Sequence, residues 1–257
     1  GKISAEGETQ TVEIEIEEEE EFLKIELWIC RPDRVNIKII SPTGEESKDV
    51  GLGYYKNESG IFNFENTTYT VFYVITINLY NASPGIWKIN LTGVYINSGC
   101  YNVYLPNRSL INQNTRFLEP DPFYTVNFPT VDRNIFTVGA YDMINNSMWP
   151  PSSRGPNIRN IQKPNIVAPG VNIISAYPHN RYGNITGTSA AAAVTSGVAA
   201  LFLQYVTQNN QYKRQGFTQS IYSFFQLGAD REDNIQYPNF IYGYGLLNAR
   251  KIFEEFR

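Results

Sequence analysis

The sequence predicts a mixed fold, with a β-sandwich or jelly roll over residues 1–115 followed by an α/β region over residues 116–257. The first part alternates apolar and polar residues with the period of a half-buried strand, and turn-forming residues interrupt it often. After Leu118 the pattern changes to a near-continuous apolar run and then to apolar residues at helical spacing. We place the join between the two parts at residues 106–117, which are rich in asparagine.

The expected strands of the first part are short and show no helical pattern between them. Two of them, Thr11–Ile16 and Val35–Ile40, alternate with period two, as in an antiparallel sheet with one buried face. Further runs at Thr70–Leu79, Ile86–Leu91 and Tyr101–Leu105 bring the expectation to about seven or eight strands. Proline, glycine and asparagine at Ser41–Gly44, Asn57–Gly60 and Ser83–Gly85 supply the turns.

The second part is expected to alternate strands and helices. Ile135–Ala140 is typical of a buried parallel strand, and Thr188–Tyr205 predicts a helix. Later helices are expected at Gly216–Gln226 and Leu246–Phe256. The apolar stretch Ala190–Val206 is interrupted by polar residues, so we interpret it as a buried helix and predict no membrane partner.

Charge and cysteine content exclude several classes of function. The formal net charge of −4 makes nucleic acid an unlikely partner. The run Glu17–Glu21 is interpreted as a solvated edge or turn, with cation binding as the alternative. Cys30 and Cys100 could pair, but two cysteines do not make a disulfide scaffold and leave the redox compartment open. No zinc spacing, phosphate-binding loop or redox pair is present, so no metal and no cofactor are predicted.

One motif, Gly187-Thr188-Ser189, stands at the start of the most helical segment. A serine at a helix N-terminus is exposed, while unpaired backbone N–H groups and the positive end of the helix dipole favour an oxyanion beside it. Taken alone, such a serine is more often a simple helix cap.

The surrounding sequence favours the chemical interpretation, because it resembles the subtilisin-like serine proteases. Ser189 lies at the nucleophile position of their serine motif and Gly197 at its closing glycine. Further blocks match in order at Phe136–Tyr141, Ser152–Pro156, Lys163–Ile173 and Gly243–Ala249. The resemblance covers about residues 117–257 and implies that Ser189 is the nucleophile, that its backbone amide contributes to the oxyanion hole, and that Gly187 and Thr188 belong to the motif. Ala190, Ala193 and Val194 depart from the usual residues without replacing a group that does bond chemistry.

The remaining catalytic groups of such a protease have no counterpart in the sequence. Subtilisin-like chains carry the catalytic aspartate and histidine before the serine, and here the predicted β-sandwich occupies that space; the oxyanion asparagine also has no match. His179, Asp132 and Asp142 are interpreted as loop or turn residues rather than triad members. We therefore expect a portion of a longer protease that is inactive without a missing N-terminal part.

The order of the two parts is similar to that of the Csp proteases of spore germination, with the β-sandwich as an insertion before the block at Phe117–Pro122. This resemblance implies a protein substrate, namely the precursor of a cortex-degrading hydrolase, and an extracytoplasmic or spore-associated location. The sequence itself shows no set of residues that would bind calcium. The alternatives are an inactive regulator built on the protease fold, and a carbohydrate or adhesion module that uses Tyr54, Tyr55 and Tyr73.

Overall fold

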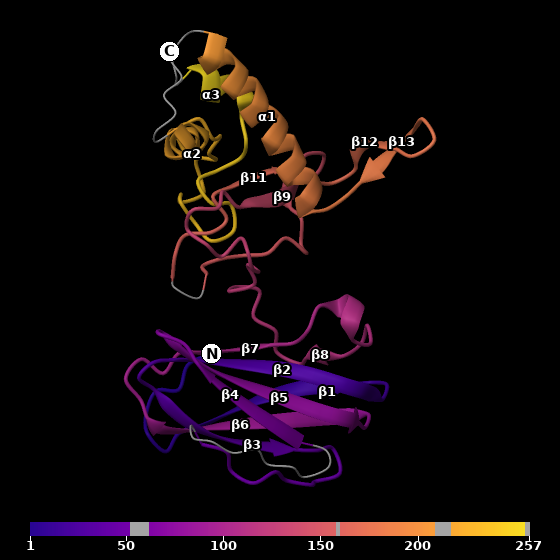
Figure 1. Cartoon of the computed structure of the whole chain (residues 1–257), viewed down its shortest axis with the longest axis vertical. Helices are drawn as coiled ribbons and strands as arrows, with labels where there is room; N and C mark the ends of the chain where they lie inside the picture. Colours follow the sequence, from indigo (N-terminus) through magenta and orange to yellow (C-terminus); the bar gives the residue numbers. More distant parts are fainter. Residues whose placement is uncertain (52–61, 158–159, 209–216, 255–257) are drawn as a thin grey trace. The chain divides into compact units, whose positions relative to one another are not determined.

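A computed structural model describes residues 1–51, 62–157, 160–208 and 217–254. The chain forms two compact units, Gly1–Pro120 and Asp121–Arg257 (Figure 1). The described residues of the first unit form strands and one short 3-10 helix, and those of the second combine strands with helices. The sheet-rich, mixed fold class that the sequence predicts is thereby confirmed.

Among the described residues of the first unit, eight strands form two four-stranded antiparallel sheets. Their orders are β3-β6-β1-β8 and β4-β5-β2-β7. The strands are β1 (Thr9–Ile16), β2 (Glu20–Cys30), β3 (Arg34–Ile40), β4 (Phe62–Thr68), β5 (Phe72–Ala82), β6 (Gly85–Tyr95), β7 (Tyr101–Tyr104) and β8 (Arg116–Phe117).

The period-two pattern explains the core of this unit, because every second side chain of a strand faces the same side. Inward-facing side chains of both sheets form a single hydrophobic core, with Ile14, Ile37 and Trp87 from one sheet and Leu27 and Ile77 from the other. The alternate positions face outward and carry charge. Thus Glu13 and Lys88, which are paired across β1 and β6, form a salt bridge at 3.1 Å.

The glutamate run is not uniformly solvated, so the interpretation of it as a solvated edge is wrong for one residue. Glu20 begins β2 and is buried, at 6% exposure. Its Oε1 accepts hydrogen bonds from the backbone N–H of Asn112 at 2.8 Å and from the hydroxyl of Thr115 at 2.6 Å. Glu20 therefore connects the segment before β8 to the start of β2 by hydrogen bonds. The other four glutamates of the run are exposed.

A disulfide joins Cys30 at the end of β2 to Cys100 just before β7, with a Cα–Cα distance of 5.7 Å. Beside it, the buried carboxylate of Asp33 accepts hydrogen bonds from the backbone N–H groups of Asn97, Ser98 and Gly99. A covalent bond and an ionic group therefore hold the same loop against the end of β2.

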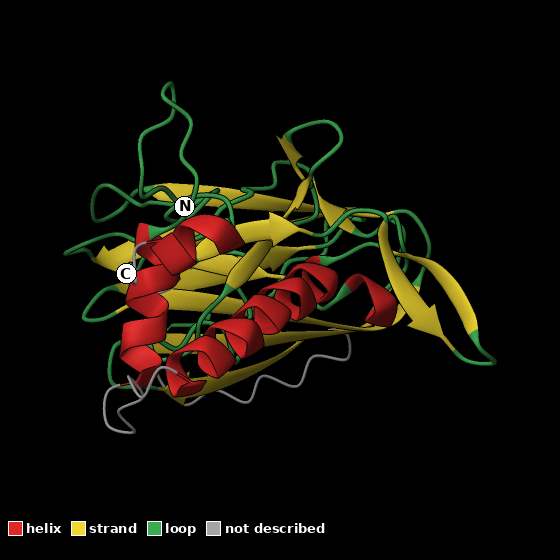
Figure 2. Ribbon diagram, turned by 90° about the horizontal axis from the view of Figure 1, so that it is seen from above, coloured by secondary structure: helices red, strands yellow, loops and turns green. Residues whose placement is uncertain are grey.

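The second unit contains a small sheet of order β10-β9-β11 with helices packed on it (Figures 1 and 2). The pair β9–β11 is parallel and the pair β9–β10 is antiparallel. A separate hairpin, β12–β13, projects from the unit in both views. The elements are β9 (Val138–Asp142), β10 (Ser147–Met148), β11 (Ile166–Pro169), β12 (Ile173–Tyr177), β13 (Arg181–Ile185), α1 (Thr188–Gln208), α2 (Phe217–Leu227) and α3 (Ala249–Glu254).

Helix α1 buries one face, whereas the sequence predicts a buried helix. Its buried side chains are Ala190, Ala191, Thr195, Phe202 and Val206. Ala191 packs on Ala140 of β9 and Ala168 of β11. Phe202 and Val206 pack with Phe225 of α2 and Ile252 of α3. By length and composition alone α1 is apolar enough to cross a membrane. We assign it as a core helix because its buried face packs on the sheet and on the other helices.

Candidate active site

The candidate nucleophile lies where the chain turns from the β12–β13 hairpin into α1. Gly187 has φ of +153° and is followed by the first helical residue, Thr188. The N–H groups of Ala190 and Ala191 both donate to the carbonyl oxygen of Gly187, at 3.1 and 3.3 Å. Glycine suits this position because side chains are rarely tolerated at such a φ. The helix therefore begins in a fixed direction.

Small residues bring the start of α1 close to the sheet. Ala140 of β9, Ala168 of β11 and Ala191 of α1 are fully buried against one another. At Gly170, directly after β11, an added Cβ would lie 2.6 Å from the Cβ of Ala140 and 2.8 Å from the carbonyl oxygen of Gly187. A larger residue at any of these positions would separate the helix from the sheet.

Ser189 occupies the first turn of α1, and its side chain is exposed. Among the described residues, neither its hydroxyl nor its backbone N–H has a hydrogen-bond partner. The N–H groups of a first helical turn have no partner within the helix and carry its positive partial charge. Ser189 thus presents both a hydroxyl and an unpaired amide N–H to a substrate carbonyl group. An acyl-transfer site needs this arrangement.

His179 lies at the turn of the β12–β13 hairpin, between Tyr177 and Arg181, where it is exposed with φ of +63°. No hydrogen bond joins its ring to Ser189 within the described part of the chain. The sequence predicts a connecting loop at His179, whereas in the structure two short strands, β12 and β13, flank it.

The two aspartates considered as triad members serve local turns. The carboxylate of Asp142 accepts from the backbone N–H of Ile144 at 2.9 Å and from the side chain of Asn145 at 2.6 Å. The Asn145 hydrogen bond holds the pKa of Asp142 below its ordinary value. Asp132 accepts from the backbone N–H of Asn134 at 2.7 Å. Among the described residues, no group of three His, Cys, Asp or Glu side chains is placed to hold a metal ion.

The late block, Gly243–Ala249, supports the far side of the sheet. Asn248 caps α3, because its Oδ1 accepts from the N–H of Lys251 at 3.0 Å while its Nδ2 donates to Asp230 at 2.7 Å. Leu246 forms bridges with both Val167 of β11 and Asp230. The block therefore extends the sheet beyond β11 rather than contributing a reactive group.

In the second unit, sequence reasoning missed the buried ionisable residue Lys163, which is 1% exposed. Its Nζ donates to the carbonyl oxygen of Ile135 at 2.6 Å and to the hydroxyl of Thr137 at 2.9 Å. Burial lowers the pKa of Lys163 to about 8, against an opposing effect of Asp132. A lysine followed by Pro164 carries no sequence signal of burial, because lysines are rarely found inside.

Comparison with known proteins agrees with this geometry. Residues 107–245, more than half of the chain, match the model of the subtilase family. This chain belongs to the subtilase family. The resemblance inferred from the sequence motifs is confirmed, and with it the subtilase-like character of the second part of the chain.

Two relatives from Bacillus subtilis (strain 168) show how much of a subtilase the chain represents. It is 34% identical over 145 residues to the serine protease AprX, which is 49% of this chain and 31% of AprX. It is 48% identical over 48 residues to the major intracellular serine protease, which is 19% of this chain and 15% of that protein. This subtilase chain therefore spans about a third or less of these relatives.

The CspB protease of Clostridium perfringens is similar over almost the whole chain. The match has a TM-score of 0.86 at 25% identity and covers 99% of this chain and 56% of CspB. The two units of this subtilase chain thus both have counterparts in one known protease. This match confirms the resemblance to Csp-type proteases.

Proposed function

We propose that this chain is the nucleophile-bearing portion of a serine endopeptidase, with Ser189 as the nucleophile and with the triad histidine and aspartate supplied by a part outside these residues. The observation that carries the proposal is the placement of Ser189. Its hydroxyl is exposed at the start of α1, within the segment that matches the subtilase family. In the described part of the chain, neither this hydroxyl nor the Ser189 amide has a hydrogen-bond partner.

In the complete site, Ser189 Oγ attacks the carbonyl carbon of the scissile peptide while the histidine takes the hydroxyl proton. The negative charge that develops on the carbonyl oxygen is stabilised by the N–H of Ser189 and the positive end of α1. The histidine then gives the proton to the leaving amine. Water attacks the acyl-enzyme by the same route and restores the hydroxyl.

An unfilled sheet edge supports the proposal of a missing part. On the side away from β11, β9 is paired with β10 at Tyr141 and Asp142, and Ala140 accepts from the N–H of Trp149 at 3.1 Å and donates to the hydroxyl of Ser152 at 3.1 Å. Among the described residues, no strand pairs with Val138 on this side. A buried parallel strand with an open edge is unusual, because unpaired strand edges attract further strands. We infer that the missing part adds its strand beside Val138, at the start of β9.

The substrate that we propose is a protein precursor, namely that of a cortex-degrading hydrolase, at an extracytoplasmic or spore-associated location. The similarity to CspB over both units supports this. We also infer a jelly-roll topology for the first unit. Its strands pair as β1–β8, β2–β7, β3–β6 and β4–β5, which is the order produced by rolling up one long hairpin.

The alternative of a binding module gains no support from the described tyrosine. Tyr54 and Tyr55 lie outside the described residues. Tyr73 is half-buried against the core of the first unit, and the guanidinium of Arg31 lies 5.2 Å from its ring centre. A side chain covered in this way is poorly placed to stack on a sugar.

Labelling with a fluorophosphonate tests the proposed function. The 257-residue chain alone should not react, because without a base the Ser189 hydroxyl stays protonated and weakly nucleophilic. The same chain, preceded by or mixed with the missing part of its natural protease, should be labelled at Ser189.

A matched control is available on the same helix. Ser189→Ala should abolish labelling, whereas Ser196→Ala should not, since Ser196 is an exposed serine that donates to the carbonyl oxygen of Ala192 at 2.8 Å. A completed protease that binds its missing part but resists the label would instead support the inactive regulator.

A further inference from the structure

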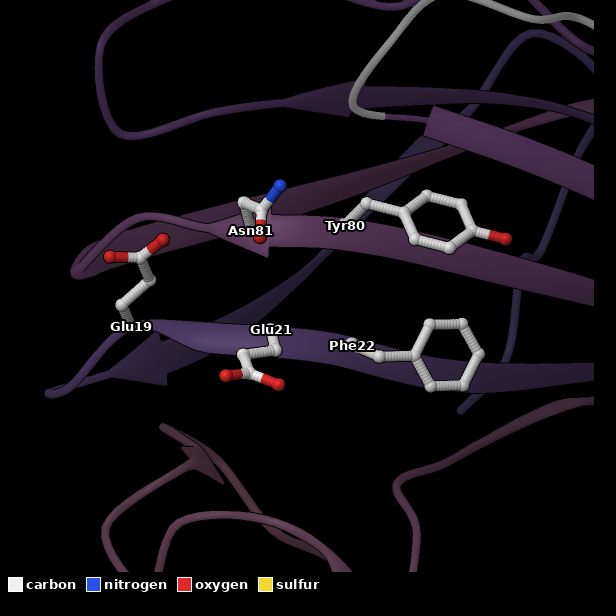
Figure 3. A pocket seen from close by; sticks show the side chains of 5 residues that line it. All are labelled: Glu19, Glu21, Phe22, Tyr80 and Asn81. Carbon is white, nitrogen blue, oxygen red and sulfur yellow. The ribbon is translucent and has the colours of Figure 1, made fainter.

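A shallow pocket of ≈ 590 Å³ lies on the first unit at one end of the β2–β5 strand pair (Figure 3). It is lined by Glu19, Glu21, Phe22, Tyr80 and Asn81. In Figure 3 the rings of Phe22 and Tyr80 lie side by side, while the carboxylates of Glu19 and Glu21 lie nearer the end of the strands. Its volume is within the range of small-ligand sites, about 300–1,000 Å³.

The pocket exists because both strands break their alternation at the same place. Between the buried residues Glu20 and Leu23, Glu21 and Phe22 are both exposed. On β5, Tyr80 and Asn81 are likewise both exposed before the buried Ala82, and Asn81 has φ of +49°. A strand that kept its period would turn one residue of each pair inward.

The pocket contains a pair of aromatic rings that are exposed to solvent. Phe22 and Tyr80 are opposite each other in the register, with ring centres 5.4 Å apart and exposures of 48% and 40%. The period of the strands directs both rings outward, because the next pair in the register, Leu23 and Leu79, is buried. Exposed aromatic pairs of this kind provide a surface on which a planar or cationic group can stack.

The negative charges beside the two rings have no positively charged partner in the described part of the chain. Among the described residues, the carboxylates of Glu19 and Glu21 form no ion pair and accept no hydrogen bond. The lysine next along the strand, Lys24, is engaged with Glu26 at 2.8 Å. The pocket therefore combines two free negative charges with two ring faces.

We propose that this pocket docks a basic segment of another polypeptide, with an arginine stacked on Phe22 and Tyr80 and paired with Glu19 and Glu21. Arginine is preferred to lysine because its planar guanidinium both stacks on rings and donates to two carboxylate oxygens at once. The same unit already contains such a contact between Arg31 and Tyr73. The inference concerns binding alone and does not depend on Ser189 being reactive.

Fluorescence anisotropy with the full chain tests this docking site. The probe is a labelled peptide, Gly-Ser-Arg-Gly-Arg-Ser-Gly, and its control carries citrulline, a neutral residue of the same shape, in place of each arginine. We expect the arginine peptide to bind about five- to tenfold more tightly than the citrulline peptide, and salt to reduce the difference. Equal binding of the two peptides would overturn the proposal.

Variants then place the binding in the pocket. Glu21→Gln and the pair Phe22→Ala and Tyr80→Ala should each weaken binding of the arginine peptide about threefold or more. Glu18→Gln removes the same charge from an exposed neighbour that does not line the pocket, and it should change binding less than about twofold.

Two results would count against the assignment. An equal loss for Glu18→Gln and Glu21→Gln would mean that the acidic run attracts the peptide as a whole. If the chain binds calcium ions at Glu19 and Glu21 but does not bind the arginine peptide, the carboxylates belong to a metal site instead. Circular dichroism of each variant checks that the sheets are retained.

Discussion

The backbone N–H of Gly187 donates to the carbonyl oxygen of Gly170 at 2.8 Å, and this bond joins the residue before α1 to the residue after β11. The whole β12–β13 hairpin lies between the two glycines, yet its ends are held together at its base. A second bond there runs from the N–H of Asn172 to the hydroxyl of Thr186 at 2.9 Å. The position of Ser189 is consequently set by the sheet rather than by the exposed hairpin.

Gly170→Ala should disturb the contact between the end of β11 and the start of α1. The new Cβ would lie 2.6 Å from Ala140 Cβ and 2.8 Å from the Gly187 carbonyl oxygen, so helix and sheet must separate. Overpacking of this kind costs about 1–3 kcal/mol. We expect a lower urea midpoint for the second unit, and weaker fluorophosphonate labelling once the protease is completed.

Gly197→Ala is the matched control for that change. Gly197 lies within α1, and an added Cβ there meets nothing within 4 Å. Alanine in a helix interior is more favourable than glycine by about 1 kcal/mol, so this variant should be as stable as the parent or more so. Equal destabilisation by both variants would contradict the role of Gly170.

Much of the second unit could be predicted because local patterns coincide with its packing. The helix beginning at Thr188 and the helices α2 and α3 follow from apolar spacing and small residues. The predicted strand Ile135–Ala140 overlaps β9, which begins and ends later, at Val138 and Asp142. The position of Ser189 at a helix start follows in the same way. Its catalytic role stays a prediction, because its hydroxyl has no hydrogen-bond partner among the described residues.

Other features could not be predicted because they depend on long-range contacts. Whether Cys30 pairs with Cys100 is decided by strands that are far apart in sequence. Glu20 is buried because it accepts hydrogen bonds from Asn112 and Thr115, which are more than 90 positions away in the sequence. The exposure of Glu21 next to the exposed Phe22 depends on a local break in alternation, which hydropathy alone does not reveal.

The buried lysine should give the second unit a distinctive pH dependence. The pKa of Lys163 is lowered by burial to about 8, from an ordinary value of 10.5. Between these values the unfolded chain binds more protons than the folded one, so stability rises with pH in this window. We expect a gain on the order of 2–3 kcal/mol between pH 8 and pH 10 in urea unfolding.

Lys163→Met identifies the group responsible. It removes the titration, so the variant should show a flatter profile over the same window, whatever its absolute stability. Lys48→Met, at an exposed lysine, should leave the profile of the parent unchanged. A parent protein with no rise above pH 8 would show that the Lys163 ammonium is not disfavoured by its surroundings.

The disulfide should contribute strongly to the first unit. It links residues separated by 70 positions, and a cross-link that closes a loop of this length restricts the unfolded chain by about 4 kcal/mol. Cys30→Ala with Cys100→Ala should therefore lower the unfolding midpoint. Dithiothreitol should lower the midpoint of the parent in the same way and leave that of the double variant unchanged.

The carboxylate of Asp33 should make the same unit sensitive to acid. Burial alone would raise the pKa of Asp33, but hydrogen bonds from Asn97, Ser98 and Gly99 outweigh it and hold the pKa below its ordinary value. The stabilisation is therefore complete above that ordinary value and is lost as the pH falls through the lowered one. Asp33→Asn should cost about 2–3 kcal/mol at neutral pH, because an amide replaces one acceptor oxygen with a donor that faces other donors.

The pH profile separates a charge effect from a loss of shape at Asp33. If the carboxylate acts as described, the stability difference between parent and Asp33→Asn should shrink as the pH is lowered toward 2, because both side chains are then neutral. The exposed Asp49, whose Oδ1 lies 3.7 Å from Lys38 Nζ, offers the comparison, and Asp49→Asn should change stability by less than about 0.5 kcal/mol. A difference for Asp33→Asn that stays constant down to pH 2 would assign its effect to packing, since only the ionised form of Asp33 gains from the three amide donors.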